Sequence, residues 1–318
     1  MMRCEVLLAR VLVGVCALGA AGCREAGTPP EAARPADTNR QVYQVKGVIR
    51  ELHPDRKKVK VSHEEIPGYM EAMTMMLDVK DARELDGLQT NDQISFHMVV
   101  TENDGWIERI TRLGVATGAI TTSAPPTFRR AREVEPLNVG DVMPDYPFTN
   151  QVGRPVRLSD FKGQAVAITF IFTRCPFPTF CPRMTDHFQT VHNQLLTMPG
   201  GPTNWHLLTI SFDPEFDTPA MLRNYASRYK YDPTRWSFLT GDLIEITAIT
   251  EQFGLQFWRE GGTINHNLRT VVIDAGGRVQ WIRRENEWKP EELIAEMVKA
   301  AAPPPALPSA PPAPSTGG

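Results

Sequence analysis

The chain has 318 residues, of which 42% are hydrophobic and 22% are charged, a composition typical of globular proteins with more than one buried core. Full disorder and a collagen-like fibre are therefore excluded. With 34 Lys and Arg against 37 Asp and Glu the formal net charge is -3, so no overall positive field favours nucleic acid as a partner.

The first 22 residues have the pattern of a signal peptide. Basic Arg3 precedes an apolar run over residues 11–22, which ends in small residues directly before Cys23. The run is too short to stay in the bilayer as a helix, which needs about 20 apolar residues. Residues 20–23 resemble a bacterial lipobox, and this resemblance implies an exported, periplasmic protein that is anchored to the membrane through lipidated Cys23. The alternative is ordinary cleavage near Ala21, with Cys23 left as a free thiol.

Three segments are predicted to be flexible and divide the rest of the chain. Residues 23–40 are rich in Pro, Ala and Thr and are interpreted as a tether. A second linker spans residues 116–133, and the Pro-rich tail, residues 302–318, is predicted to be disordered. Two folded domains are therefore expected, over residues 41–115 and 134–301.

The first of these domains is predicted to be all-β. Short segments of alternating hydrophobicity, separated by turn residues, indicate strands that form a small barrel. The expected strands cover residues 42–52, 57–63, 74–79, 93–101 and 106–113.

In the second domain, long apolar strands alternate with helical stretches, which predicts an α/β layer sandwich. The expected strands cover residues 166–172 and 205–212, with a hairpin over 268–274 and 278–284. The expected helices cover residues 182–196, 218–229, 243–253 and 290–299. In the first of these helices, His187 and His192 lie on different faces and are both expected at the surface. His206 opens a buried strand and is expected to be structural.

Cys175 and Cys181 lie in a loop that leaves a buried strand and enters a helix, where Pro182 suits the first helical turn. A helix N-terminus lowers the pKa of a nearby thiol and favours the thiolate, the form that attacks disulfides and binds metals. The pair is therefore a candidate redox pair or metal site. A plain structural disulfide is the alternative in an oxidising compartment.

Separated motifs of the second domain resemble, in order, those of the Sco/SenC family of thioredoxin-fold copper chaperones that act in cytochrome c oxidase assembly. The motifs are residues 139–146, 158–163, 170–182, 209–219 and 266–274. The resemblance implies a thioredoxin-like fold and copper ligands at Cys175, Cys181 and His266, with Asp213 at an acidic position near the site. Two thiolates and an imidazole suit Cu(I) and also accommodate Cu(II).

The sequence departs from this family in the length of the cysteine loop. Five residues, 176–180, separate the two cysteines, where the family usually has three. Thioredoxin proper has two, with a proline facing them from the start of a strand. The corresponding segment here, residues 264–269, has no proline, which argues against a general disulfide oxidoreductase.

Four of the twelve methionines fall within seven residues of the first domain, at Met70, Met73, Met75 and Met76. Such clusters are usually core filler. In a strand, however, Met73 and Met75 point to one face, where their thioethers can converge with His63 to suit Cu(I). The segment resembles the CusF-like periplasmic copper-binding domain, an OB-like barrel. This resemblance implies that His63, Met73 and Met75 are ligands, with Met70 about where that family has a shielding Trp.

The function expected from both resemblances is a copper chaperone that binds Cu(I) or Cu(II). It would deliver copper by ligand exchange to a copper-accepting subunit of a membrane oxidase, in assembly of the CuA centre of cytochrome c oxidase. Because ligand exchange needs no covalent catalysis, an enzymatic activity is not required. One alternative is a thiol-disulfide reductase that prepares the acceptor's cysteines, with one of Cys175 and Cys181 attacking and the other resolving. The other is a periplasmic copper buffer or sensor.

Overall fold

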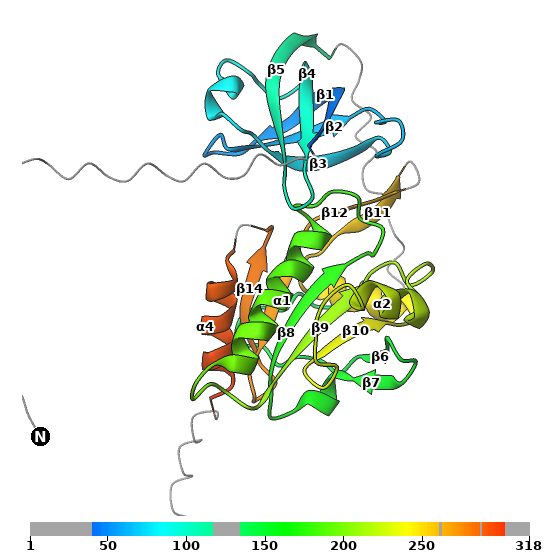
Figure 1. Ribbon diagram of the computed structural model, residues 1–318, viewed down its shortest axis with the longest axis vertical. Coiled ribbons are helices and arrows are strands. Elements are labelled where there is room, and N and C mark those ends of the chain that lie inside the picture. The colour runs from blue at the N-terminus through cyan, green and yellow to red at the C-terminus, as the bar shows by residue number, and fades with distance from the viewer. Residues whose placement is uncertain (1–39, 117–133, 261–262, 287, 303–318) are drawn as a thin grey trace, which may run out of the picture. The chain divides into compact units, whose positions relative to one another are not determined.

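The computed structural model describes residues 40–116, 134–260, 263–286 and 288–302 (Figure 1). The expected signal peptide and Cys23 lie outside these residues. So do the expected tether, second linker and tail, apart from residues 40, 116 and 302 at their ends.

The N-terminal part is a five-stranded antiparallel sheet with the strand order β3-β2-β1-β4-β5. Its strands are β1 (Gln41–Leu52), β2 (Lys58–His63), β3 (Met73–Asp78), β4 (Asp92–Val100) and β5 (Gly105–Val115). Each predicted strand is confirmed to within two residues, because alternating side chains point into the core, as in β3, where every second residue is buried.

The two edge strands of this sheet approach each other without forming a ladder. After β3, Val79 makes an isolated bridge with Ile107 of β5, and the backbone N–H of Lys80 donates to the Ile107 carbonyl at 3.0 Å. A short 3-10 helix (Ala82–Leu85) follows. The small all-β domain is thus confirmed, whereas the described residues show a strongly curled sheet rather than the closed barrel that was expected.

The C-terminal part is a seven-stranded sheet with the order β14-β13-β8-β9-β10-β6-β7. Its strands are β6 (Pro147–Asn150), β7 (Pro155–Arg157), β8 (Ala165–Ile171), β9 (Trp205–Ser211), β10 (Trp236–Thr240), β13 (Arg269–Ile273) and β14 (Val279–Arg284). Strands β8, β9 and β10 are parallel, and the other pairs are antiparallel. Every residue of β8 and β9 is buried, as expected of central strands covered on both faces.

The remaining elements of the C-terminal part are four helices, one 3-10 helix and a hairpin. These are α1 (Cys181–Thr197), α2 (Pro219–Ala226), α3 (Leu243–Gln252), α4 (Pro290–Ala300), a 3-10 helix (Leu158–Phe161), and the strands β11 (Phe257–Glu260) and β12 (Thr263–His266). All four predicted helices are confirmed. Helix α2 ends three residues earlier than expected.

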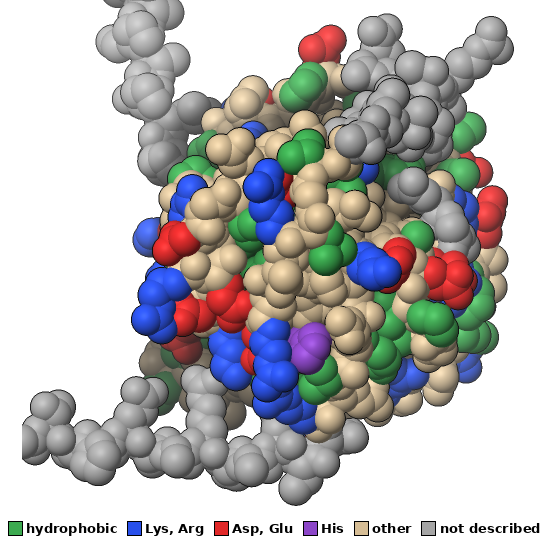
Figure 2. Space-filling view, turned by 90° about the horizontal axis from the view of Figure 1, so that it is seen from above, with side chains coloured by type: hydrophobic (Ala, Val, Ile, Leu, Met, Phe, Trp, Pro, Cys, Tyr) green, Lys and Arg blue, Asp and Glu red, His purple; other side chains and the backbone are tan. Residues whose placement is uncertain are grey.

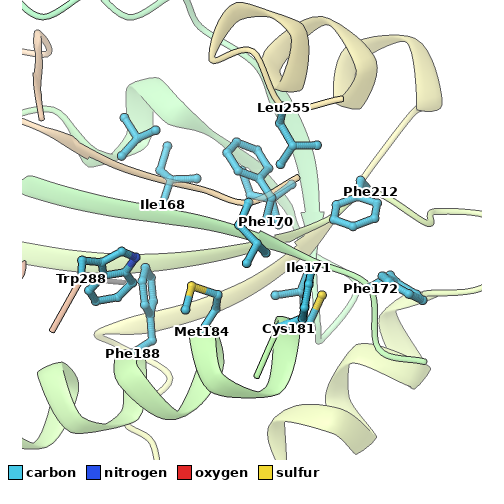
Figure 3. Packing of buried hydrophobic residues seen from close by; sticks show 14 of the residues in the cluster. Ile168, Phe170, Ile171, Phe172, Cys181, Met184, Phe188, Phe212, Leu255 and Trp288 are labelled. Atoms are coloured by element: carbon cyan, nitrogen blue, oxygen red, sulfur yellow. The ribbon is translucent and has the colours of Figure 1, made fainter. Parts of the chain in front are cut away.

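Helix α1 packs against the sheet through a buried stripe that begins at its first residue. Cys181, Met184 and Phe188 lie on this stripe and are fully buried. Figure 3 shows Met184 and Phe188 in the apolar cluster, with the sulfur of Cys181 near Ile171, toward the end where Phe172 and Phe212 lie. The core packing thus fixes one cysteine at the edge of the hydrophobic interior.

The buried stripe of α1 is wider than the sequence indicated. His192 is only 2% exposed, its ring lies 5.8 Å from that of Trp236, and its Nε2 accepts from the backbone N–H of Asp232. The expectation that His192 lies at the surface is therefore wrong. His187 is half-buried against Trp288, and His206 is buried, with its Nε2 2.9 Å from the Ser237 hydroxyl.

All the described residues belong to one compact unit. On the face shown in Figure 2, Lys and Arg side chains lie beside Asp and Glu side chains. None of the helices within the described ranges combines the length and apolarity needed to cross a membrane.

Candidate metal centre

Cys175, Cys181 and His266 come together at the C-terminal end of β8. One potential ligand atom from each residue lies within 4.8 Å of the other two. Cys175 follows β8 in the loop, Cys181 is the first residue of α1, and His266 is the last residue of β12. Both thiols are free. Three elements that are separate in the sequence thus supply one cluster of soft and borderline donors.

The orientation of His266 is fixed by a backbone hydrogen bond. Because a carbonyl oxygen only accepts, Nδ1–H donates to the Asn267 carbonyl at 3.0 Å, so Nε2 carries the lone pair. Nε2 lies 3.7 Å from Cys181 Sγ. This is the arrangement in which the second ring nitrogen of a metal-binding histidine is anchored by the protein.

Aromatic side chains surround the imidazole of His266. Its ring centroid lies 4.9 Å from that of Phe212, 5.5 Å from that of Phe172 and 6.0 Å from that of Phe180. Such apolar walls limit the access of water and lower the local dielectric constant, which strengthens interactions between a cation and its ligands.

The two thiols have different acidities. Burial raises the pKa of Cys175, but the neighbouring side chains of Cys181 and His266 outweigh this and hold its pKa well below that of an ordinary thiol. Burial and the neighbouring Cys175 raise the pKa of Cys181. The sequence analysis predicted that the helix N-terminus would lower the pKa of a nearby thiol. The thiol with the lowered pKa is instead that of Cys175, which is half-buried in the loop before the helix.

Buried carboxylates hold the loop residues that precede Cys175. Asp217 accepts from the Thr173 hydroxyl at 2.5 Å and from the Thr173 backbone N–H at 3.0 Å, and it also accepts from the Ser211 hydroxyl. Thr218, not Asp217, caps helix α2, since its hydroxyl accepts from the backbone N–H of Met221. The pairing of Asp217 with Thr173 joins residues 44 positions apart and depends on the tertiary fold.

Asp213 is not part of the Cys–Cys–His group. It is fully buried, and its two carboxylate oxygens accept from Arg174 at 2.7 Å and from Arg259 at 2.5 Å. Both arginines are exposed, and Arg174 directly precedes Cys175. With both oxygens engaged, Asp213 acts on the cysteine loop through Arg174, and the structure does not bring it to the thiols as a fourth ligand.

In the N-terminal sheet, His63 and two methionines share the buried face of neighbouring strands. His63 of β2 pairs directly with Met73 of β3, and Val61 pairs with Met75. Met73 and Met75 are buried, whereas Met76 on the opposite face is partly exposed. Residues directly opposite each other in a ladder have close Cβ atoms, so His63 and Met73 are within reach of one small ligand.

The imidazole of His63 has an unsatisfied buried nitrogen. Its Nδ1–H donates to the Glu64 carbonyl at 2.7 Å, so Nε2 carries the lone pair, and this atom is buried without a hydrogen-bond partner among the described residues. Burial lowers the pKa of His63 and favours the neutral ring. An unpaired buried acceptor is costly, and a soft cation is a partner it can take.

Met70 adds a third buried thioether next to this pair. It is 4% exposed, in a turn closed by a hydrogen bond from the backbone N–H of Ile66 to the Met70 carbonyl. His63, Met73, Met75 and Met70 therefore present a neutral imidazole and uncharged sulfur atoms, a donor set that suits Cu(I).

Two families match different parts of the chain. The SCO1/SenC family matches residues 134–302, and the family described as copper binding periplasmic protein CusF matches residues 42–112. A SCO1 protein homolog of Bacillus subtilis (strain 168) is 36% identical over 175 residues, which cover 53% of this chain and 86% of that protein. A mitochondrial SCO2 homolog of Bos taurus is 31% identical over 113 residues, covering 36% of this chain and 40% of that protein.

Among solved structures, a SCO1/SenC family lipoprotein from Bacillus anthracis str. Ames is 26% identical, with a TM-score of 0.47, over 54% of this chain and 100% of that one. The family match spans more than half of the sequence and contains both cysteines and His266. The chain therefore belongs to the SCO1/SenC family, and a CusF-like segment precedes the family region.

Proposed function

We propose that this protein is a copper chaperone that holds Cu(I) on Cys175, Cys181 and His266. The observation that carries the proposal is the convergence of these three ligand atoms within 4.8 Å of one another. Two sulfurs and an imidazole match the preference of Cu(I) for soft ligands, and the same set accommodates Cu(II). The acceptor in this proposal is a copper-accepting subunit of a membrane oxidase, in assembly of the CuA centre of cytochrome c oxidase.

Delivery would proceed by ligand exchange. Cys175 is the more exposed of the two thiols, so an acceptor ligand can displace it first, while Cys181 and His266 still hold the metal. The copper keeps its oxidation state throughout. The aromatic rings around His266 keep water from competing for the open coordination position.

A second Cu(I) site is proposed in the N-terminal sheet, at His63, Met73 and Met75, with Met70 beside them. The unpaired buried Nε2 of His63 supports it, because this atom lacks any other partner among the described residues. Thioethers bind Cu(I) without losing a proton, so this site is suited to capturing copper that is later passed on.

The proposed location is the periplasmic side of the membrane, with lipidated Cys23 as the anchor. The short apolar run before Cys23 supports export. Mass spectrometry of the mature N-terminus tests the acylation directly. A Cys23→Ser form should move from the membrane fraction to the soluble periplasmic fraction, and an unaltered protein that is soluble and lacks acyl chains would exclude the anchor.

The asymmetry of the two thiols favours one alternative, a thiol-disulfide reductase that prepares the acceptor's cysteines. A half-buried thiol with a lowered pKa can attack a disulfide, and a buried neighbour with a raised pKa can resolve the mixed disulfide. This activity needs the thiols of Cys175 and Cys181, whereas His266 affects it only by lowering the pKa of Cys175.

An anaerobic Cu(I) titration of the reduced full chain against a competing chelator tests the proposal. The parent for all variants carries Cys4→Ser, Cys16→Ser and Cys23→Ser, so that Cys175 and Cys181 are its only thiols. We expect this parent to bind two equivalents of Cu(I) tightly, and its Cys175→Ser, Cys181→Ser variant to bind one. If the parent binds only one equivalent and the variant binds it equally well, the cysteine site is excluded and the reductase is favoured.

A further inference from the structure

One small cavity joins the two proposed copper sites. Its volume is about 10 Å³, and Met70, Met73 and Met75 line it together with Cys175 and His266. A space of this size holds about one water-sized particle. The thioethers of the N-terminal sheet and two ligands of the cysteine site therefore border the same small cavity.

The long segment between the cysteines forms part of this arrangement. The hydroxyl of Tyr69 donates to the Pro176 carbonyl at 3.2 Å. The ring of Phe177 packs against Gly105 at the start of β5, so closely that a Cβ on Gly105 would lie 2.7 Å from Phe177 Cζ. The loop between the cysteines, residues 176–180, is two residues longer than is usual in the family. It thus serves as a contact surface for the N-terminal sheet.

Further polar contacts hold the two parts of the chain together around the cavity. Arg183 of α1 forms an ion pair with Asp104 at 2.7 Å. On β3, the backbone N–H of Thr74 donates to the side-chain oxygen of Asn265 at 3.2 Å. Thr74 lies between two of the methionines and Asn265 directly precedes His266, so this bond links the two donor sets.

We propose that Cu(I) passes directly between the methionine site and the cysteine site of the same chain, through this cavity. The inference rests on the proposed function, because both sites must bind copper. The extended cysteine loop builds the passage, and the metal never enters bulk solvent between the two sites.

The transfer is a ligand exchange without electron transfer. Neutral thioethers release Cu(I) to the thiolate of Cys175, and His266 and Cys181 complete the new coordination. The thiol proton of Cys181 leaves to solvent as its sulfur binds the metal. Because thiolates are charged and thioethers are not, copper is expected to move from the methionines to the cysteines.

Stopped-flow absorbance distinguishes passage within a chain from exchange between chains. The reduced parent chain, with Cys175 and Cys181 as its only thiols, is mixed without oxygen with half an equivalent of Cu(I). The Cu(I)–thiolate charge-transfer band reports arrival at the cysteines. We expect a first-order phase whose rate does not change with protein concentration.

Transfer between chains supplies the reference rate. A copper-loaded Cys175→Ser, Cys181→Ser chain is mixed with a copper-free Met73→Leu, Met75→Leu chain, so that copper must move between molecules. At micromolar protein, the transfer within one chain should be on the order of 100-fold faster, since linked sites have effective concentrations up to the millimolar range.

Substitutions at the contact surface test the role of the loop without changing a ligand. Gly105→Ala pushes against Phe177. Asp104→Asn weakens the ion pair with Arg183, and Tyr69→Phe removes the hydrogen bond to Pro176. Asp145→Asn is the matched control, because Asp145 pairs with Arg157 in a similar exposed ion pair and does not line the cavity.

We expect Gly105→Ala to slow the first-order phase at least tenfold, with smaller effects from the other two contact variants and none from the control. Each variant should still bind two equivalents at equilibrium. If Gly105→Ala no longer binds two equivalents of Cu(I), the transfer rates of Asp104→Asn and Tyr69→Phe test the inference instead.

Two outcomes would overturn the inference while leaving both copper sites in place. One is a transfer rate in the parent that scales with protein concentration, and the other is transfer in the contact variants as fast as in the control. Absence of any Cu(I)–thiolate band at equilibrium would instead remove the proposed cysteine site, and the inference with it.

Discussion

Cys181 Sγ lies 3.7 Å from Nε2 of His266, although the two residues are 85 positions apart in the chain. The buried stripe of α1 fixes the cysteine, and the Asn267 carbonyl fixes the ring of the histidine. The two groups are therefore positioned independently before any ligand arrives. Pre-organisation of this kind reduces the cost of ordering side chains when a metal binds.

Replacing His266 should weaken copper binding more than thiol chemistry, because both thiols remain. We expect His266→Ala to weaken Cu(I) binding at the cysteine site at least tenfold, which corresponds to about 1.4 kcal/mol, because one of three ligands is lost. Chelator competition measures the affinity, and the rate of exchange with a small disulfide measures thiol activity. His53→Ala, at a partly exposed histidine that pairs with Asp55, is the control. Unchanged copper affinity in His266→Ala would exclude this residue as a ligand.

Alkylation should identify Cys175 as the more reactive thiol in the reduced, metal-free protein. Since its pKa is held below the ordinary thiol value, the rate of modification by iodoacetamide should level off at a lower pH than for a free cysteine. Cys181, which is fully buried with a raised pKa, should react much more slowly. Peptide mapping by mass spectrometry assigns the modified residue, and faster modification of Cys181 would contradict the assignment.

The sequence predicted the long elements of the fold better than the short ones. Strands β8 and β9 are continuous apolar runs and all four helices have clear patterns, so these were found. Strand β10 and the hairpin of β11 and β12 are four or five residues long and gave no periodic signal. The two edge strands of the N-terminal sheet meet only at the isolated bridge between Val79 and Ile107 in the described residues. The alternation of apolar and polar residues predicts strands, but it does not determine whether their sheet closes into a barrel.

The candidate site was predicted only in part for a similar reason. The cysteines stood out by their position between a strand and a helix, whereas the place of His266 came from the family resemblance. The contacts of Asp217 with Thr173 and of Tyr69 with Pro176 join residues far apart in the sequence, and no local pattern reports them. The different acidities of the two thiols likewise depend on burial and on neighbours that only the fold brings together.

The carboxylate of Asp217 should be needed to hold the loop before Cys175. Asp217→Asn retains the size of the side chain but places an amide where donors from Thr173 and Ser211 point, leaving at least one buried donor unpaired. We expect a loss of about 1–3 kcal/mol in the free energy of unfolding, measured by urea denaturation. Asp232→Asn, in an exposed turn with Thr234, should cost less. Equal losses in both variants would contradict a special role for Asp217.

His206 should make the protein less stable in mild acid. Burial, with a smaller contribution from Arg235, lowers the pKa of His206 to about 4 in the folded chain, whereas the unfolded value is near 6.5. Between these two values the unfolded chain binds a proton that the native chain does not. The free energy of unfolding therefore falls as the pH drops through this window, by about 2 kcal/mol at pH 5 for one such group.

Urea denaturation at pH 7 and pH 5 measures this contribution. His206→Gln retains a polar group beside Ser237 but cannot take the proton, so the variant should lose about 2 kcal/mol less than the parent chain between the two pH values. The other buried histidines, His63 and His192, remain in both proteins and cancel in the comparison. His53→Gln, at a partly exposed position, should follow the parent. If His206→Gln loses as much stability as the parent on acidification, the histidine is not held neutral by burial, and the packing of its ring against Phe161 at 4.5 Å must leave room for the charged form.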